Sequence, residues 1–160
     1  AGGIISLNTF TGILGCVAFG FISDKYFGAR RPPVTLMFGV VEIISLMVIF
    51  FGPNSTIVLT IAFLVYGFTL SGLLAVLGGL FALDIAPKNI SGAAMGFIGL
   101  FSYIGAGIQE KISSLLIKTS TLEASSDLVY NFDSAILFWV VASVISFLLS
   151  LTLWNKKTED

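Results

Sequence analysis

A stripe of small and polar residues runs along the otherwise apolar segment between Ile90 and Lys118. Its members recur at every third or fourth position: Gly92, Gly96, Gly99, Tyr103, Gly107, Lys111 and Ser114. At about 100° per residue, this spacing predicts one face of a helix. Tyr103 can donate a hydrogen bond and Lys111 can bind an anion, whereas the glycines allow another helix to pack closely. Alternatively, Tyr103 packs as an aromatic and Lys111 extends to lipid headgroups.

Three more polar residues are candidates for contact with a ligand. Glu110 directly precedes Lys111, and adjacent residues diverge by about 100° around a helix, so Glu110 flanks the stripe. We expect an anionic ligand to compete with Glu110 for Lys111. Asn8 lies in the first apolar segment and is expected to face a cavity, unless the polar side chains there only bond their own backbone. Glu42 is interpreted as a structural carboxylate, with proton coupling as the alternative.

The composition excludes several classes of function. The 160 residues are 56% hydrophobic and 11% charged, whereas soluble domains are about one quarter charged. The chain has no histidine and a single cysteine, Cys16, which argues against His-dependent catalytic sites, disulfides and metal sites. The net charge of −1 indicates no nucleic-acid partner. We therefore expect no enzyme activity, no cofactor and no metal.

Apolar runs of about 20 residues, the length that crosses a bilayer, recur along the chain. They predict an all-α polytopic membrane protein with five transmembrane helices in a single domain over residues 1–160. The predicted spans are 2–23, 34–52, 56–86, 90–118 and 134–154, separated in part by loops at 24–33 and 119–133. The third span is longer than a bilayer requires, so we expect a tilt or a bend near Gly67, Gly72 or Gly78-Gly79. Because the first span starts at the first residues, we expect a fragment.

Basic residues predict the orientation, because they accumulate on the cytoplasmic side of a membrane. With the 24–33 loop in the cytoplasm, the C-terminus is cytoplasmic as well. Only Lys118, and Lys111 near it, then face outward. The cytoplasmic side holds Lys25, Arg30, Arg31, Lys88, Lys156 and Lys157.

Two motifs resemble known families. The first reads Gly20-Phe-Ile-Ser-Asp24-Lys25-Tyr-Phe-Gly28-Ala-Arg30-Arg31 and resembles the G-x-x-x-D-(R/K)-x-G-(R/K)-(R/K) loop of the major facilitator superfamily, with one or two extra residues. An ordinary basic loop with its own counter-ion is the alternative. The second reads Asp84-Ile-Ala-Pro87-Lys88-x-x-x-Gly92, then Gly96-Phe97-x-Gly99-Leu100-Phe101-x-Tyr103. It resembles helices 10 and 11 of the organophosphate:phosphate antiporters.

The resemblance covers nearly the whole chain, as helices 8 to 12 of a twelve-helix fold, and implies a bacterial inner-membrane carrier. Such a carrier exchanges a phosphate ester for inorganic phosphate by alternating access between two six-helix halves. The arginines that grip the phosphate belong to helices 1 and 7, outside this chain, so the N-terminal helices of the carrier are implied partners. Asp24, Asp84 and Lys88 are implied to serve a cytoplasmic gate.

The resemblance also bears on the substrate. Tyr103 matches a tyrosine of helix 11, and Lys111 matches a lysine of the hexose-phosphate antiporters, whose acidic partner lies one turn earlier and not next door, as Glu110 does. Hexose 6-phosphate is therefore favoured, with glycerol 3-phosphate open. Two alternatives remain: a hexose-phosphate sensor of the same family, and an organic anion:proton symporter that uses Glu42.

Overall fold

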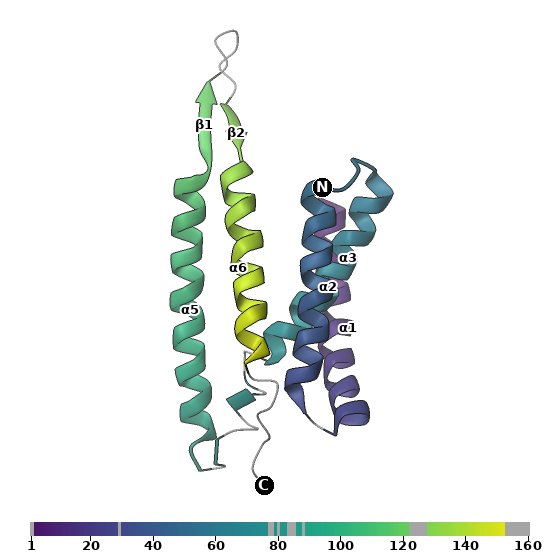
Figure 1. Cartoon of the computed structure of the whole chain (residues 1–160), viewed down its shortest axis with the longest axis vertical. Coiled ribbons are helices and arrows are strands. Elements are labelled where there is room, and N and C mark those ends of the chain that lie inside the picture. Colours follow the sequence, from purple (N-terminus) through teal and green to yellow (C-terminus); the bar gives the residue numbers. More distant parts are fainter. Residues whose placement is uncertain are drawn as a thin grey trace.

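The computed structural model describes residues 2–28, 30–76, 79, 81–82, 86–87, 89–121 and 128–152. In these residues, five helices and one hairpin follow one another (Figure 1). Their order and bounds are α1 (Gly2–Phe27), α2 (Arg31–Phe51), α3 (Thr56–Ala75), α5 (Ser91–Leu116), β1 (Lys118–Thr121), β2 (Leu128–Asn131) and α6 (Asp133–Leu151).

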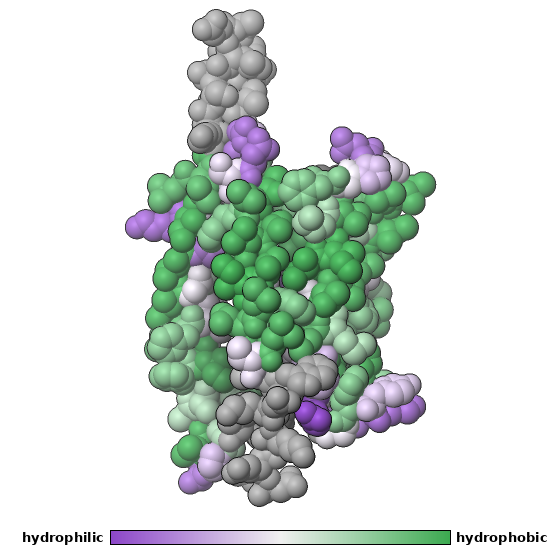
Figure 2. All heavy atoms as spheres, viewed as in Figure 1, coloured by the Kyte–Doolittle hydropathy of each residue, from purple (hydrophilic) through white to green (hydrophobic). Residues whose placement is uncertain are grey.

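The predicted class of fold, an all-α polytopic membrane protein, is confirmed. The helices α2, α3, α5 and α6 are long and apolar enough to cross a bilayer. For α1, which is 26 residues long, a membrane crossing stays a prediction. Figure 2 shows apolar residues across the middle of the visible face and hydrophilic residues gathered at its two ends. This distribution suits a protein whose middle contacts lipid.

The turn between α1 and α2 is much shorter than the predicted 24–33 loop. α1 continues to Phe27, and α2 already begins at Arg31. Gly28 has a φ of 57°, a left-handed conformation that ends helices and favours glycine. Pro32 and Pro33 lie in the first turn of α2, where proline needs no backbone donor. The prediction of a loop there was wrong because both helix ends extend into the motif.

The third predicted span is irregular near its C-terminal end, one of the places where we expected a bend. Regular α-helix ends at Ala75, and π-helical geometry is found at Val76 and Gly79, before Phe81 and Ala82 resume the helix. A π-helical turn disturbs the regular hydrogen-bond ladder. The irregularity therefore lies in the region of Gly79, whereas Gly67 and Gly72 are inside the regular helix. Gly78 lies outside the described residues.

The polar segment predicted as a loop at 119–133 contains an antiparallel hairpin. Strand β1 pairs with β2 from Lys118 opposite Asn131 to Thr121 opposite Leu128. The fourth span thus ends at Leu116, before Lys118. Two factors explain the hairpin: threonine and valine favour strands, and the hairpin joins two helices, α5 and α6, that run side by side (Figure 1).

The helices form two groups that meet where α2 contacts α6. The helices α1, α2 and α3 form one group, and α5 and α6 the other (Figure 1). Phe38 anchors the first group, with its ring 5.1 Å from that of Phe19 and 5.7 Å from that of Phe68, between ring centroids. The α1–α2 turn, the start of α5 and the end of α6 lie at one end of the molecule. The hairpin and the N-terminus lie at the other, an arrangement compatible with the predicted sidedness.

Close contact between α1 and α3 holds the first group together. A Cβ atom at Gly15 would overlap the backbone carbonyl of Phe68, and one at Gly12 would overlap the Ser71 hydroxyl. The Sγ of Cys16 donates a hydrogen bond to the Ser71 carbonyl at 3.1 Å. Small residues at this interface let the backbones approach, which is how helices associate in a bilayer.

Candidate functional site

The predicted stripe occupies one face of α5, because this helix is unbroken from Ser91 to Leu116. Tyr103 is 82% exposed. Cβ atoms built at Gly92, Gly96, Gly99 and Gly107 would meet no neighbour within 4 Å. Among the described residues, nothing covers this face. A role of Gly92, Gly96 and Gly99 in helix packing therefore stays a prediction, as does contact of Tyr103 with substrate.

Lys111 and Glu110 are both exposed and form no ion pair with each other in the described structure. Ser113 is the only buried residue of α5, and it contacts α6. Lys111 lies two residues earlier, about 200° around the helix, and so points away from α6. Its ammonium is available to an anion on the open face, whereas Glu110 lies toward the other group of helices.

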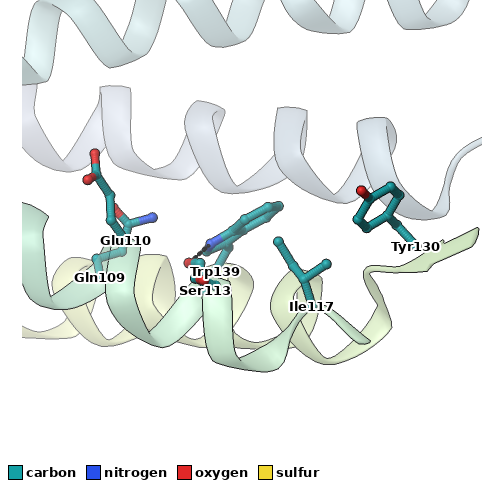
Figure 3. Close-up of a pocket in the computed structure, with 7 residues that line it drawn as sticks. Gln109, Glu110, Ser113, Ile117, Tyr130 and Trp139 are labelled. Atoms are coloured by element: carbon teal, nitrogen blue, oxygen red, sulfur yellow. Dashed lines mark hydrogen bonds between the residues drawn. The ribbon is translucent and has the colours of Figure 1, made fainter. Parts of the chain in front are cut away.

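A shallow outer pocket lies between α5, α6 and the hairpin (Figure 3). Its volume is about 500 Å³, and it is open to the surroundings. The indole N–H of Trp139 donates a hydrogen bond to Ser113 Oγ at 2.8 Å. This bond holds together the inner wall of the pocket. The pocket is lined by Gln109, Glu110, Ser113, Ser114, Ile117, Tyr130 and Trp139.

A larger inner cavity, about 810 Å³, lies among α2, α3, α5 and α6. Most of its lining is apolar, but Glu42 of α2 and Tyr66 of α3 are part of it. A polar stripe on α6 also faces it: Trp139, Ser143, Ser146 and Ser150. This stripe was not predicted from the sequence, although its steps of four, three and four residues match a helical period.

Asn8 lies at the interface between α1 and α3. A Cβ atom at Gly67 would overlap the Asn8 side chain, so the amide fits into the notch that this glycine leaves. One turn later, Thr11 donates hydrogen bonds to the carbonyls of Asn8, at 2.9 Å, and of Leu64 on α3, at 3.1 Å. Asn8 is half-buried, and its predicted place in a substrate cleft stays a prediction.

The motif residues between Gly20 and Arg31 converge at the α1–α2 turn. The Arg31 guanidinium lies 2.9 Å from the Asp24 carboxylate, with the arginine side chain 12% exposed and the aspartate 63%. The Lys25 ammonium lies 5.0 Å from the centre of the Phe21 ring. Arg30 is exposed, and its N–H donates to the Phe27 carbonyl at 3.1 Å. The predicted gate thus has a paired carboxylate in the described structure.

The second motif is only partly described. Pro87 is exposed in the turn before α5, and its carbonyl accepts a hydrogen bond from the Ile90 N–H at 2.9 Å. Asp84 and Lys88 lie outside the described residues. In the part of the chain that the structure describes, no group of three or more histidine, cysteine, aspartate or glutamate residues could hold a metal ion.

Residues 1–109, from α1 into the second half of α5, match the family model described as Major Facilitator Superfamily. The chain belongs to the Major Facilitator Superfamily. Within this superfamily, it is 37% identical over 100 residues to the glycerol-3-phosphate transporter of Bacillus subtilis. It is 33% identical over 105 residues to the membrane sensor protein UhpC of Salmonella typhimurium. It is also 28% identical over 109 residues to a probable hexose phosphate transport protein of Chlamydia pneumoniae.

These superfamily relatives confirm the predicted resemblance to the organophosphate:phosphate antiporter family. The alignments cover 62% to 65% of this chain but only 22% to 24% of each relative. The chain thus matches a minor part of each protein's length. No solved structure matches it.

Proposed function

We propose that this chain is the C-terminal part of a carrier that exchanges a phosphorylated sugar or glycerol for inorganic phosphate across a bacterial inner membrane. The relatives include a glycerol-3-phosphate transporter and a probable hexose phosphate transport protein, which supports this substrate class. The transport is driven by the gradients of the two anions and requires no covalent step.

The open face of α5 is the observation that carries this proposal. A lysine within an apolar span is costly and is usually kept for a ligand or a counter-ion. Lys111 lies on the face that Tyr103 shares, away from α6, and forms no ion pair with a described residue. In our interpretation, this face borders the substrate cleft, where the ammonium attracts the phosphate and the phenol donates to an ester or sugar oxygen.

The α1–α2 turn supplies the proposed cytoplasmic gate. Arg31 is mostly buried while its partner Asp24 is mostly exposed, so the carboxylate can change partners without a charged group being newly buried. Carriers of this kind alternate between two conformations by rocking one half against the other. We propose that Asp24 contributes to the balance between these conformations.

A sensor is the second candidate, because membrane sensor proteins of two bacteria are 33% and 31% identical to this chain. A sensor needs the same recognition of the ester but no flux. An organic anion:proton symporter is a further alternative, which would depend on Glu42.

Reconstitution of the intact protein into liposomes loaded with labelled phosphate separates these functions. We expect external hexose 6-phosphate to release the label, with glycerol 3-phosphate as the second substrate tested. Saturable binding of an ester without release of phosphate would identify a sensor. Uptake of an anion that requires a proton gradient and no internal phosphate would identify a symporter.

A further inference from the structure

Glu42 places a carboxyl group in the middle of a membrane-spanning helix. It is the twelfth of the 21 residues of α2, so about 16 Å of helix precedes it at 1.5 Å per residue. An ionised carboxylate at this depth costs about 2.5 to 3.5 kcal/mol even on the lowest scales. Such a residue requires a specific environment, and the proposed phosphate exchange does not use it.

The cavity that Glu42 lines is mostly apolar, and the other polar groups in its lining are uncharged. The side chain lines the inner cavity, where α3 contributes Tyr66 and α6 contributes Ser143 and Ser146. No lysine or arginine lines this cavity among the described residues, and α6 carries no charged residue after Asp133. The lining thus offers hydroxyl groups but no cation that would neutralise the charge of Glu42.

The inner cavity adjoins the outer pocket. Gln109 and Trp139 line both of them, and the outer pocket, which Tyr130 of the hairpin also lines, is open to the surroundings (Figure 3). Ser113, Ser114 and Glu110 add polar groups along the outer part. The outer pocket and the inner cavity that Glu42 lines thus adjoin at Gln109 and Trp139, and we assign this connection as the route of the proton.

We propose that Glu42 is a proton-binding site inside the membrane, reached from the hairpin end through the gap between α5 and α6. A hydronium ion transfers its proton to a carboxylate oxygen of Glu42, which leaves a neutral carboxyl group and a water molecule. The charged form is favoured when water fills the cavity, and the neutral form when the helices close over it. Proton binding and the conformational cycle are thereby linked, each shifting the other.

Infrared difference spectroscopy of the intact protein in lipid nanodiscs tests this site without any substrate. Between about pH 5 and about pH 9, a range that includes the titration of perturbed carboxyl groups, we expect the loss of a carboxyl C=O band. The band should persist in Asp133→Asn, a control at the exposed start of α6, and be absent from Glu42→Gln. A wild-type spectrum without a titrating buried carboxyl band, or a band that survives in Glu42→Gln, would overturn the proposal.

Tyr66→Phe is a second variant that keeps the carboxyl group, should Glu42→Gln fail to fold. Loss of the neighbouring hydroxyl should move the carboxyl band to a different wavenumber, because the C=O stretch responds to its hydrogen-bond donors. An unchanged band would contradict the assigned site. Since neither measurement involves a phosphate ester, a failure of the proposed exchange would leave both results intact.

Discussion

Trp139 of α6 donates its indole N–H to Ser113 Oγ of α5 at 2.8 Å, across a gap in which these two helices otherwise touch little. Ser113 is the buried residue of α5. The bond therefore fixes the rotation of α5 about its own axis, which in turn directs Lys111 and Tyr103 to the open face. Together with the hairpin that joins the two helices, this hydrogen bond thus orients the residues that we propose to contact substrate.

The first prediction concerns a variant that lacks this hydrogen bond. Ser113→Ala removes the acceptor of the indole N–H of the half-buried Trp139, and a typical hydrogen bond contributes about 0.5 to 1.5 kcal/mol. We expect unfolding of the protein by sodium dodecyl sulfate in mixed micelles to begin at a lower detergent fraction. The control is Ser114→Ala, because Ser114 is exposed. Equal stability of the two variants would show that the bond contributes nothing.

The second prediction concerns the approach of α1 to α3. Gly15→Ala places a methyl group against the backbone of Phe68, which cannot rotate away, so we expect a loss of about 1 to 3 kcal/mol. Gly20→Ala on the same helix meets nothing within 4 Å and is the matched control. Folded yield and thermal stability in detergent measure both. A Gly15→Ala protein as stable as Gly20→Ala would contradict the observed packing.

The third prediction concerns the end of α1. Gly28 has a φ of 57°, which costs a residue with a side chain about 1 to 2 kcal/mol. We expect Gly28→Ala to lower the thermal stability more than Gly28→Asn, because asparagine tolerates this conformation. Gly105→Ala, in the open part of α5, should have little effect. Identical losses for alanine and asparagine would show that the strain lies elsewhere.

Much of the helical architecture could be predicted, because long apolar segments in this chain leave few alternatives to membrane helices. The predicted start of the fourth helix, residue 90, differs from the observed start, Ser91, by a single residue. This boundary was predictable because Pro87 disfavours a helical conformation of the residue before it. The predicted loop at 24–33 failed for a local reason. Gly28 and the prolines of α2 are as compatible with a tight turn between two helices as with a loop.

Other features depend on contacts that no local pattern contains. The hairpin requires α5 and α6 to bring Lys118 and Asn131 together. Likewise, nothing in the spacing of Gly12 and Gly15 showed that α3 is the partner. The serines of α6 were visible at a helical period, but a polar stripe does not reveal which cavity it faces. Tyr103 and Lys111 lie on one helix, as predicted. Their contacts with a ligand stay a prediction, because no described residue lies opposite this face of α5.

The fourth prediction concerns the proposed gate. Asp24→Asn removes the charge that pairs with the mostly buried Arg31, which should shift an equilibrium by more than the ~1 kcal/mol, or roughly fivefold, of a fully exposed pair. We expect slower exchange of labelled phosphate, with the concentration of ester for half-maximal exchange nearly unchanged. Lys25→Gln, which leaves the pair of Asp24 with Arg31 intact, is the control. Weaker ester affinity with normal turnover would exclude a gating role.

The fifth prediction concerns the proposed anion site on α5. Lys111→Gln removes a cation from the open face, and we expect about a tenfold higher ester concentration for half-maximal exchange, equivalent to about 1.4 kcal/mol. Lys111→Arg keeps the charge and should retain most of the affinity. If Glu110 competes with the ester for Lys111, Glu110→Gln should tighten ester binding. An unchanged affinity in Lys111→Gln would contradict the proposed anion site. It would favour the alternative in which the Lys111 ammonium extends to lipid headgroups.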